Sequence, residues 1–309
     1  MKILTAYNSS WHKLGNHHER YFQNKSDEVR AYDIAQSPLL TDLRGILPFY
    51  IPKGLPVTLD SLQDKYKTAF DFLLEVDGPG QYHVFKRSSS CLHFLWSQDI
   101  QREDKQKLHR WIEKDSDAIF VALKSYLSFF KHRPAVWLPF ACDPDVHSKH
   151  DLPKAYDVVF IGNVDPRVYP DRVRLLDALS KKIKISVFTG VYGKESAPIY
   201  SQAKIVLNIC SFGEVNLRIF EALSCGSMLL TNRLGPETGL HELFEDGKHL
   251  VLYDRVDDLA EKIDHYLKNS DERERIALEG YREVRSRHTY FNRAEAVVET
   301  AKKLQKVYK

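Results

Sequence analysis

The chain has 309 residues, of which 43% are hydrophobic and 28% charged, a balance typical of soluble globular proteins with a substantial core. Its formal net charge of +3 is small, so a partner held mainly through phosphate contacts, as in obligate nucleic-acid binding, is not indicated. No run of about 18 apolar residues predicts a membrane span, and the first residues do not resemble a signal peptide. The four cysteines form no CxxC pair, which argues against zinc or disulfides and favours reduced thiols in the cytoplasm.

The first half of the chain predicts strands that alternate irregularly with helices. Such an alternation is typical of parallel βαβ units. The expected elements are a strand at residues 2–7, a proline-rich loop at 48–56, a helix at 62–74, a strand at 91–96, a helix at 102–114, and strands at 118–122 and 136–140.

The second half alternates more regularly and predicts a Rossmann-like doubly wound sheet. The expected elements are strands at residues 156–162, 183–188, 203–209, 227–231 and 250–253, with helices at 170–180, 217–224 and 256–267.

The domain boundaries follow from composition and from the last apolar stripe. A polar stretch at 143–154 contains two prolines, so we expect an N-terminal domain at 1–152 and a C-terminal domain at 153–285. Apolar residues between 294 and 304 share one helical face and predict a closing helix within 286–309. That helix packs either on its own domain or back on the N-terminal domain.

The most informative stretch is 208–226, in which a strand runs into a polar, glycine-containing loop and then a helix. Ligands of doubly wound sheets bind at the carboxyl ends of strands, and a helix N-terminus there suits a diphosphate. Asn216 and Arg218 stand at this entrance, and Glu221 lies on the same helical face as Arg218. An arginine suits a diphosphate and a carboxylate suits two ribose hydroxyls. The alternative is an ordinary surface pair of arginine and glutamate.

Residues 216–231 resemble the C-terminal signature of the CgeB-like (spore maturation protein) glycosyltransferases, relatives of the group 1 GT-B transferases. Segments 137–145, 156–163, 242–249 and 288–294 resemble further motifs of that family in the same order. The resemblance is good over 137–300 and loose over 1–136. It implies a GT-B fold, with two Rossmann-like doubly wound domains facing an interdomain cleft and the donor site in the C-terminal half.

The same resemblance implies roles for two glutamates. It makes Glu221 the ligand of the donor ribose and Glu214 a contact to the donor sugar. The broader group separates these glutamates by seven residues, whereas here the separation is six, which weakens the assignment of Glu214.

Two further loops of the second half are donor-side candidates. Gly162 and Asn163 end the first strand of the donor domain, and glycine lets backbone approach a phosphate closely. Arg167 or Arg172 neutralises the leaving diphosphate in this interpretation; the alternative, more common for a single arginine, is a solvated surface charge. In the loop at 189–193, Tyr192 beside Gly193 stacks on the nucleotide base, or the two glycines there simply form a turn.

Candidates in the first half concern the acceptor. The segment 96–99 resembles a Trp-x-x-Asp element of CgeB-like proteins, which makes Asp99 a catalytic or acceptor-orienting carboxylate; the alternative is a helix N-cap. Gly15, His17 and His18 fall where GT-B proteins have a loop that lines the acceptor cleft, or form part of a surface helix.

The sequence therefore predicts a glycosyltransferase (EC 2.4) that moves a sugar from a nucleotide diphosphate, UDP rather than GDP, to a hydroxyl of a glycan, protein or DNA. No Asp-x-Asp motif is present, which favours a metal-independent reaction without a further cofactor. One alternative is a phage-type DNA-base glycosyltransferase, and another is a non-catalytic nucleotide-binding module. A Rossmann dinucleotide enzyme is disfavoured because no GxGxxG follows the first strand.

Overall fold

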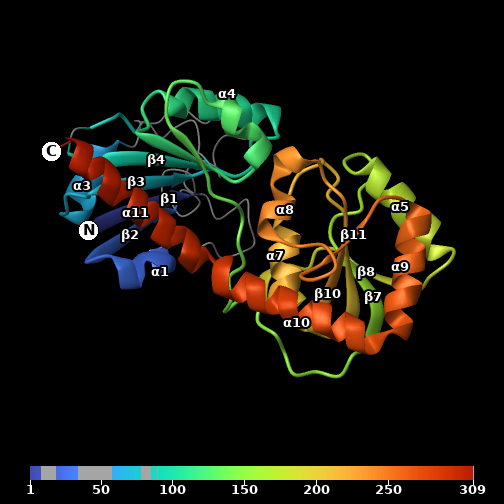
Figure 1. Cartoon of the computed structure of the whole chain (residues 1–309). Helices are drawn as coiled ribbons and strands as arrows, with labels where there is room; N and C mark the ends of the chain where they lie inside the picture. Colours follow the sequence, from blue (N-terminus) through green and yellow to red (C-terminus); the bar gives the residue numbers. More distant parts are fainter. Residues whose placement is uncertain (8–18, 34–57, 78–84, 89, 309) are drawn as a thin grey trace, which may run out of the picture. The chain divides into compact units, whose positions relative to one another are not determined.

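The computed structural model describes residues 1–7, 19–33, 58–77, 85–88 and 90–308 (Figure 1). The chain divides into two compact units. Unit 1 comprises Met1–Pro139 and Phe291–Lys309, and unit 2 comprises Phe140–Tyr290. The boundaries expected from composition were at 152/153 and 285/286. Gly15, His17 and His18 lie outside the described residues.

Unit 1 contains a six-stranded parallel sheet with the order β2-β1-β3-β4-β5-β6. Strands β3, β4 and β5 are buried along their whole length, the pattern of a parallel sheet whose two faces are both covered. The strands are β1 (Lys2–Tyr7), β2 (Glu28–Asp33), β3 (Phe72–Val76), β4 (Leu92–Ser97), β5 (Ala118–Val121) and β6 (Ala135–Trp137), with helices α1 (Glu19–Phe22), α3 (Leu59–Tyr66) and α4 (Glu103–Glu113).

The helix predicted at 62–74 is wrong in its second part, because α3 ends at Tyr66 and residues 72–76 form β3. Lys67 takes the left-handed conformation (φ 52°) and caps α3 through its backbone N–H. Glycine is the usual residue at such a cap, so the chain turns here without the usual sequence signal.

The C-terminal helix α11 (Tyr290–Tyr308) packs on unit 1 from Phe291 onward (Figure 1). The ring of Phe291 meets that of Tyr21 edge to face at 5.2 Å, and Glu295 forms an ion pair with Lys25 at 2.7 Å. The predicted apolar stripe is buried, through Ala294, Val297, Val298 and Ala301.

A buried polar network joins the carboxyl ends of β3 and β4. Asp77, with φ 54°, accepts hydrogen bonds from the backbone N–H groups of Gln98 (3.1 Å) and Asp99 (3.0 Å) and pairs with Lys105 at 2.7 Å. His109 of α4 is fully buried, with Nδ1 2.9 Å from the hydroxyl of Ser97 and Nε2 3.5 Å from Asp77. The network fixes the loop that carries Asp99.

Unit 2 contains a five-stranded parallel sheet with the order β11-β10-β9-β7-β8. Strands β8 and β9 lie on opposite sides of β7, so the winding of the chain reverses between β7 and β9. The strands are β7 (Tyr156–Ile161), β8 (Ile185–Phe188), β9 (Ala203–Asn208), β10 (Met228–Asn232) and β11 (Val251–Tyr253), with helices α5 (Pro170–Ser180), α6 (Ser196–Ser201), α7 (Leu217–Ser224), α8 (Leu240–Leu243), α9 (Val256–Lys268) and α10 (Ser270–Arg287).

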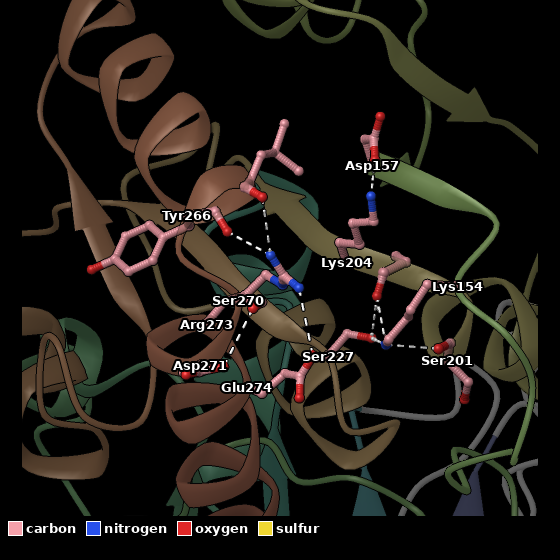
Figure 2. Close-up of polar contacts among 12 residues, drawn as sticks. Lys154, Asp157, Ser201, Lys204, Ser227, Tyr266, Ser270, Asp271, Arg273 and Glu274 are labelled. Atoms are coloured by element: carbon pink, nitrogen blue, oxygen red, sulfur yellow. Dashed lines mark hydrogen bonds and ion pairs between the residues drawn. The ribbon is translucent and has the colours of Figure 1, made fainter.

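Helices cover both faces of this sheet, α5 and α9 on one and α7 on the other (Figure 1). Helix α10 joins the α9 side through Ile276 and Ala277 and packs on α7 at Gly280. Only Asn269 separates α9 from α10, and Arg273 stabilises the corner by donating to the carbonyl of Tyr266 at 2.6 Å (Figure 2). A guanidinium at the end of α9 also complements its dipole.

At the amino-terminal edge of the sheet, Lys154 anchors the segment before β7 (Figure 2). Its ammonium donates to the carbonyls of Ser201 (2.9 Å) and Ala203 (2.7 Å) and to the hydroxyl of Ser227 (3.2 Å). The three acceptors satisfy the three N–H groups of the ammonium, so this lysine has a structural role.

The predicted α/β class with two Rossmann-like, doubly wound parallel sheets is confirmed. None of the helices in the described part of the chain is long and apolar enough to cross a membrane.

We predict that His109 makes stability depend on pH. Burial, the largest cause, lowers the pKa of His109 from 6.5 in the folded protein. Below about pH 6.5 the unfolded chain therefore binds more protons than the folded one, and the free energy of unfolding falls as the pH falls. Urea unfolding at pH 7.5 and 5.0 should show a larger loss for the wild type than for His109→Gln. Equal losses would contradict this prediction.

Candidate functional site

An arginine bridges the two strands between which the winding of unit 2 reverses. Arg172 of α5 donates from Nη1 to the carbonyl of Asn163, just after β7, at 2.8 Å. It also donates from Nη2 to the carbonyl of Ile209, just after β9, at 3.3 Å. In open α/β sheets, ligands bind outside the carboxyl ends of the strands at this switch point.

Arg172 is buried, with 6% of its surface exposed. Its guanidinium lies 4.0 Å from the ring centroid of Tyr169 and 5.5 Å from that of Phe160, both within cation–π range. Burial, and then the positive charge of Arg218, lower the pKa of Arg172 to about 10. The side chain is therefore still charged at neutral pH, in a place where its charge is poorly solvated.

Arg218 of α7 brings a second guanidinium to the same place. Its Nη1 donates to Oδ1 of Asn208, the last residue of β9, at 2.8 Å, and its guanidinium lies 4.9 Å from the ring centroid of Phe160. A Cβ at Gly162 would overlap Nη2 of Arg218, so the glycine gives the guanidinium its space. Neither Arg172 nor Arg218 forms an ion pair with a carboxylate of the described residues, and an anion would compensate both.

The N-terminus of α7 adds to this positive potential. Asn216 is the N-cap residue, but its side chain does not cap the helix; Nδ2 donates instead to Oδ1 of Asn208 at 3.2 Å. The first turn of α7 contains no acidic residue. The positive end of the helix dipole therefore stays uncompensated beside Arg218.

Buried polar atoms without a hydrogen-bond partner converge on this end of the sheet. Within the described part of unit 2 they include Nε of Arg172, Oγ of Ser211 and Oδ1 of Asn216. Each buried unpaired polar atom costs about 1–3 kcal/mol, and such atoms are rare in folded proteins. An anionic ligand with hydroxyl groups would supply partners for these atoms and for the two guanidinium groups.

Glu221 lies on α7 beside a histidine that sequence reasoning missed. His147 is 3% exposed, and its Nε2 lies 3.4 Å from Oε1 of Glu221. Its carbonyl accepts a hydrogen bond of 2.6 Å from the hydroxyl of Ser224, also on α7. Only folding brings this polar segment to α7, so no local pattern predicts the contact.

The structure distinguishes Arg172 from Arg167, the two arginines that the sequence offered for the diphosphate. Arg172 lies at the switch point, whereas Arg167 is 87% exposed and pairs with Asp165 at 2.6 Å. The side chain of Asn163 accepts from the N–H of Asp165 at 2.8 Å, so this residue organises the loop and offers its carbonyl to Arg172.

The other donor-side candidates lie in two loops at the same edge of the sheet. Tyr192 is 47% exposed after β8, and Gly193 is buried with φ 55°, a conformation that favours glycine. Glu214 is half-buried in the loop between β9 and α7.

Asp99 of unit 1 is half-buried directly after β4. The N-cap of the following helix is Arg102, so Asp99 does not occupy that position. The structure adds Asp77 as a buried carboxylate that supports the Asp99 backbone; its glycine-rich surroundings in the sequence indicate only a turn.

No group of three or more His, Cys, Asp or Glu side chains among the described residues is arranged to hold a metal ion.

Comparisons with known proteins relate the second half of the chain to a family and the whole chain to a fold. Residues 149–299 match the model of a family described as glycosyl transferase-like. A search of curated proteins finds no match.

Solved structures share the fold at low sequence identity. Anabaena HepE in complex with UDP and glucose superposes with a TM-score of 0.66 and 13% identity, covering 98% of this chain and 100% of that one. A structure of the same protein with UDP-glucose gives 0.61 and 11%, at the same coverage. Sucrose-phosphate synthase from Thermosynechococcus elongatus gives 0.58 and 15%, covering 80% of this chain and 76% of that one. The fold is thus that of the GT-B glycosyltransferases, as the sequence predicts.

We predict that Gly162→Ala weakens anion binding without unfolding the protein. The added methyl group displaces the end of the flexible Arg218 side chain and breaks its hydrogen bond to Asn208. The dissociation constant for pyrophosphate, measured by calorimetry, should rise by about tenfold, which corresponds to about 1.4 kcal/mol. An unchanged constant in a folded variant would show that the guanidinium does not touch the anion.

Proposed function

We propose that the protein is a glycosyltransferase of class EC 2.4 that uses a UDP-sugar as donor and a hydroxyl group as acceptor. The observation that carries this proposal is the pair of uncompensated guanidinium groups, Arg172 and Arg218, at the switch point of unit 2. The match of residues 149–299 to a glycosyl transferase-like family supports it, as do GT-B neighbours solved with UDP and UDP-glucose.

The arginines act on the leaving group. As the bond between the anomeric carbon and the β-phosphate oxygen breaks, negative charge develops on that oxygen. Arg172, Arg218 and the N–H groups at the start of α7 stabilise this charge. Because they are held in place before the reaction, little reorganisation is needed when the charge appears.

The acceptor oxygen forms the new bond to the anomeric carbon and releases its proton. In our proposal Asp99 takes this proton if the reaction inverts the anomeric centre, and orients the acceptor if it does not. The hydrogen bond from the Asp99 backbone to buried Asp77 gives its loop the rigidity that either role requires.

The remaining donor contacts follow the family resemblance. Glu221 binds the ribose hydroxyls and Glu214 the donor sugar. Tyr192 and Gly193 adjoin the base, and Gly162, Asn163 and Arg167 contribute to the diphosphate loop, together with Asn216 at the helix entrance. The CgeB-like assignment and the cytoplasmic location belong to the same proposal.

Two alternatives keep parts of this site. A phage-type DNA-base glycosyltransferase would need a basic surface for duplex DNA, which the net charge of +3 does not favour. A non-catalytic nucleotide-binding module would bind UDP-sugars without turnover. Measurement of UDP release from a panel of UDP- and GDP-sugars, with glycan, protein and DNA acceptors, separates the three.

We predict that Arg172→Lys and Arg218→Gln each raise the dissociation constant for UDP by about tenfold or more. Lysine keeps the charge of Arg172 but loses the planar fork that spans two carbonyls. The matched control is Arg174→Gln on the same helix, whose exposed guanidinium pairs with Asp171. UDP affinity is measured by calorimetry and folding by circular dichroism. Wild-type affinity in both variants would refute the assignment of the diphosphate site.

We further predict that transfer from UDP-glucose persists in excess EDTA. In the proposed mechanism Arg172, Arg218 and the N-terminus of α7 stabilise the leaving diphosphate, a task that a divalent metal ion performs in metal-dependent enzymes. The measurement is UDP release with and without EDTA. A loss of activity that Mg²⁺ or Mn²⁺ restores would exclude the metal-independent mechanism.

A further inference from the structure

Two aromatic side chains of unit 2 contact each other from the loops that follow β7 and β9. Phe212, in the loop after β9, is 59% exposed. Tyr169 immediately precedes α5 in the loop after β7, and the two ring centroids are 5.6 Å apart at 56°. The pair thus joins the two loops that flank the switch point.

The position of this pair matters more than its exposure. Single exposed apolar side chains are common on protein surfaces and need no explanation. Here the Tyr169 ring lies 4.0 Å from the guanidinium carbon of Arg172, so the pair adjoins the buried cation of the anion site. Ser211, next to Phe212 in the chain, contributes a buried hydroxyl oxygen without a partner among the described residues.

An apolar ring face beside an unpaired hydroxyl and a cation suits one chemical class of ligand. A pyranose presents an apolar C–H face and hydroxyl groups, and in a nucleotide sugar it is attached directly to a diphosphate. We propose that Phe212 and Tyr169 form a platform for the sugar ring of the nucleotide sugar. This inference rests on the proposed function and names the part of the substrate that the platform holds.

The order of the strands favours the sugar over the base as the occupant. The platform arises from the loops after β7 and β9, whereas Tyr192, the residue proposed to adjoin the base, follows β8 on the other side of β7. A diphosphate at Arg172 and Arg218 has a nucleoside on one end and a sugar on the other. With the base toward Tyr192, the platform beside Arg172 is left to the sugar.

The test compares ligands with and without the sugar. Dissociation constants for UDP and for UDP-glucose are measured by calorimetry for wild type, Phe212→Ala and Phe212→Tyr. Leu278→Ala is the matched control, because Leu278 is also exposed (42%) but lies on α10. For Phe212→Ala we expect the constant for UDP-glucose to rise by about tenfold and that for UDP to change less than about twofold. Phe212→Tyr, which keeps the ring, and Leu278→Ala should retain both wild-type constants.

Three outcomes would overturn the inference while leaving the proposed function intact. Equal weakening of UDP and UDP-glucose would place the base on the platform. Unchanged affinity for both ligands would show that Phe212 touches neither. Unchanged donor affinity with a raised KM for the acceptor would assign the platform to the acceptor. Failure of the wild type to bind either ligand would reject the proposed function itself, and the platform with it.

Discussion

Unit 2 depends on a guanidinium held where the strand order reverses. Arg172 donates to the carbonyls after β7 and β9 and lies within cation–π range of the rings of Tyr169 and Phe160. Those contacts hold it in place, but they do not neutralise it, and the nearby charge of Arg218 makes its ionised state less favourable. Two like charges kept close without a described acidic partner cost folding free energy. Such an arrangement is typical of a site whose missing charge arrives with the ligand.

The two sheets show that topology alone does not create this site. In unit 1 strands β2 and β3 lie on opposite sides of β1, and in unit 2 strands β8 and β9 lie on opposite sides of β7. Each sheet therefore has a switch point. In unit 1 Asp77 directly follows β3, and its carboxylate accepts hydrogen bonds from two backbone N–H groups and pairs with Lys105. At the same point of unit 2, directly after β9, the carbonyl of Ile209 accepts a hydrogen bond from Arg172, and the hydroxyl of Ser211 is buried without a partner among the described residues. In our proposal the electrostatics, rather than the fold, make unit 2 the site of the diphosphate.

Much of the fold is predictable because buried parallel strands have continuous runs of apolar residues in the sequence. Residues 158–161 and 205–207 are such runs, and the glycine and polar residues after them mark the ends of β7 and β9. The failures have equally local causes. The helix predicted at 62–74 merges α3 with β3, because the turn at Lys67 uses a left-handed lysine in place of glycine. Strand β2, at Glu28–Asp33, carries alternating charges and gave no apolar run to recognise.

The site was predictable only where its residues share one segment. Asn216 and Arg218 follow β9 within a few positions, and the structure joins both to Asn208 at the end of that strand. Contacts between distant segments, such as His147 with Glu221 or Tyr169 with Phe212, depend on the folded chain and leave no local pattern. In the proposed chemistry, recognition of the diphosphate and recognition of the sugar are separate. The arginines recognise a charge that every nucleotide diphosphate carries, so they provide affinity without selection among sugars. Selection requires contacts to the sugar itself, and at this edge of unit 2 the exposed ring of Phe212 and the unpaired hydroxyl of Ser211 are the groups with the chemistry to make them.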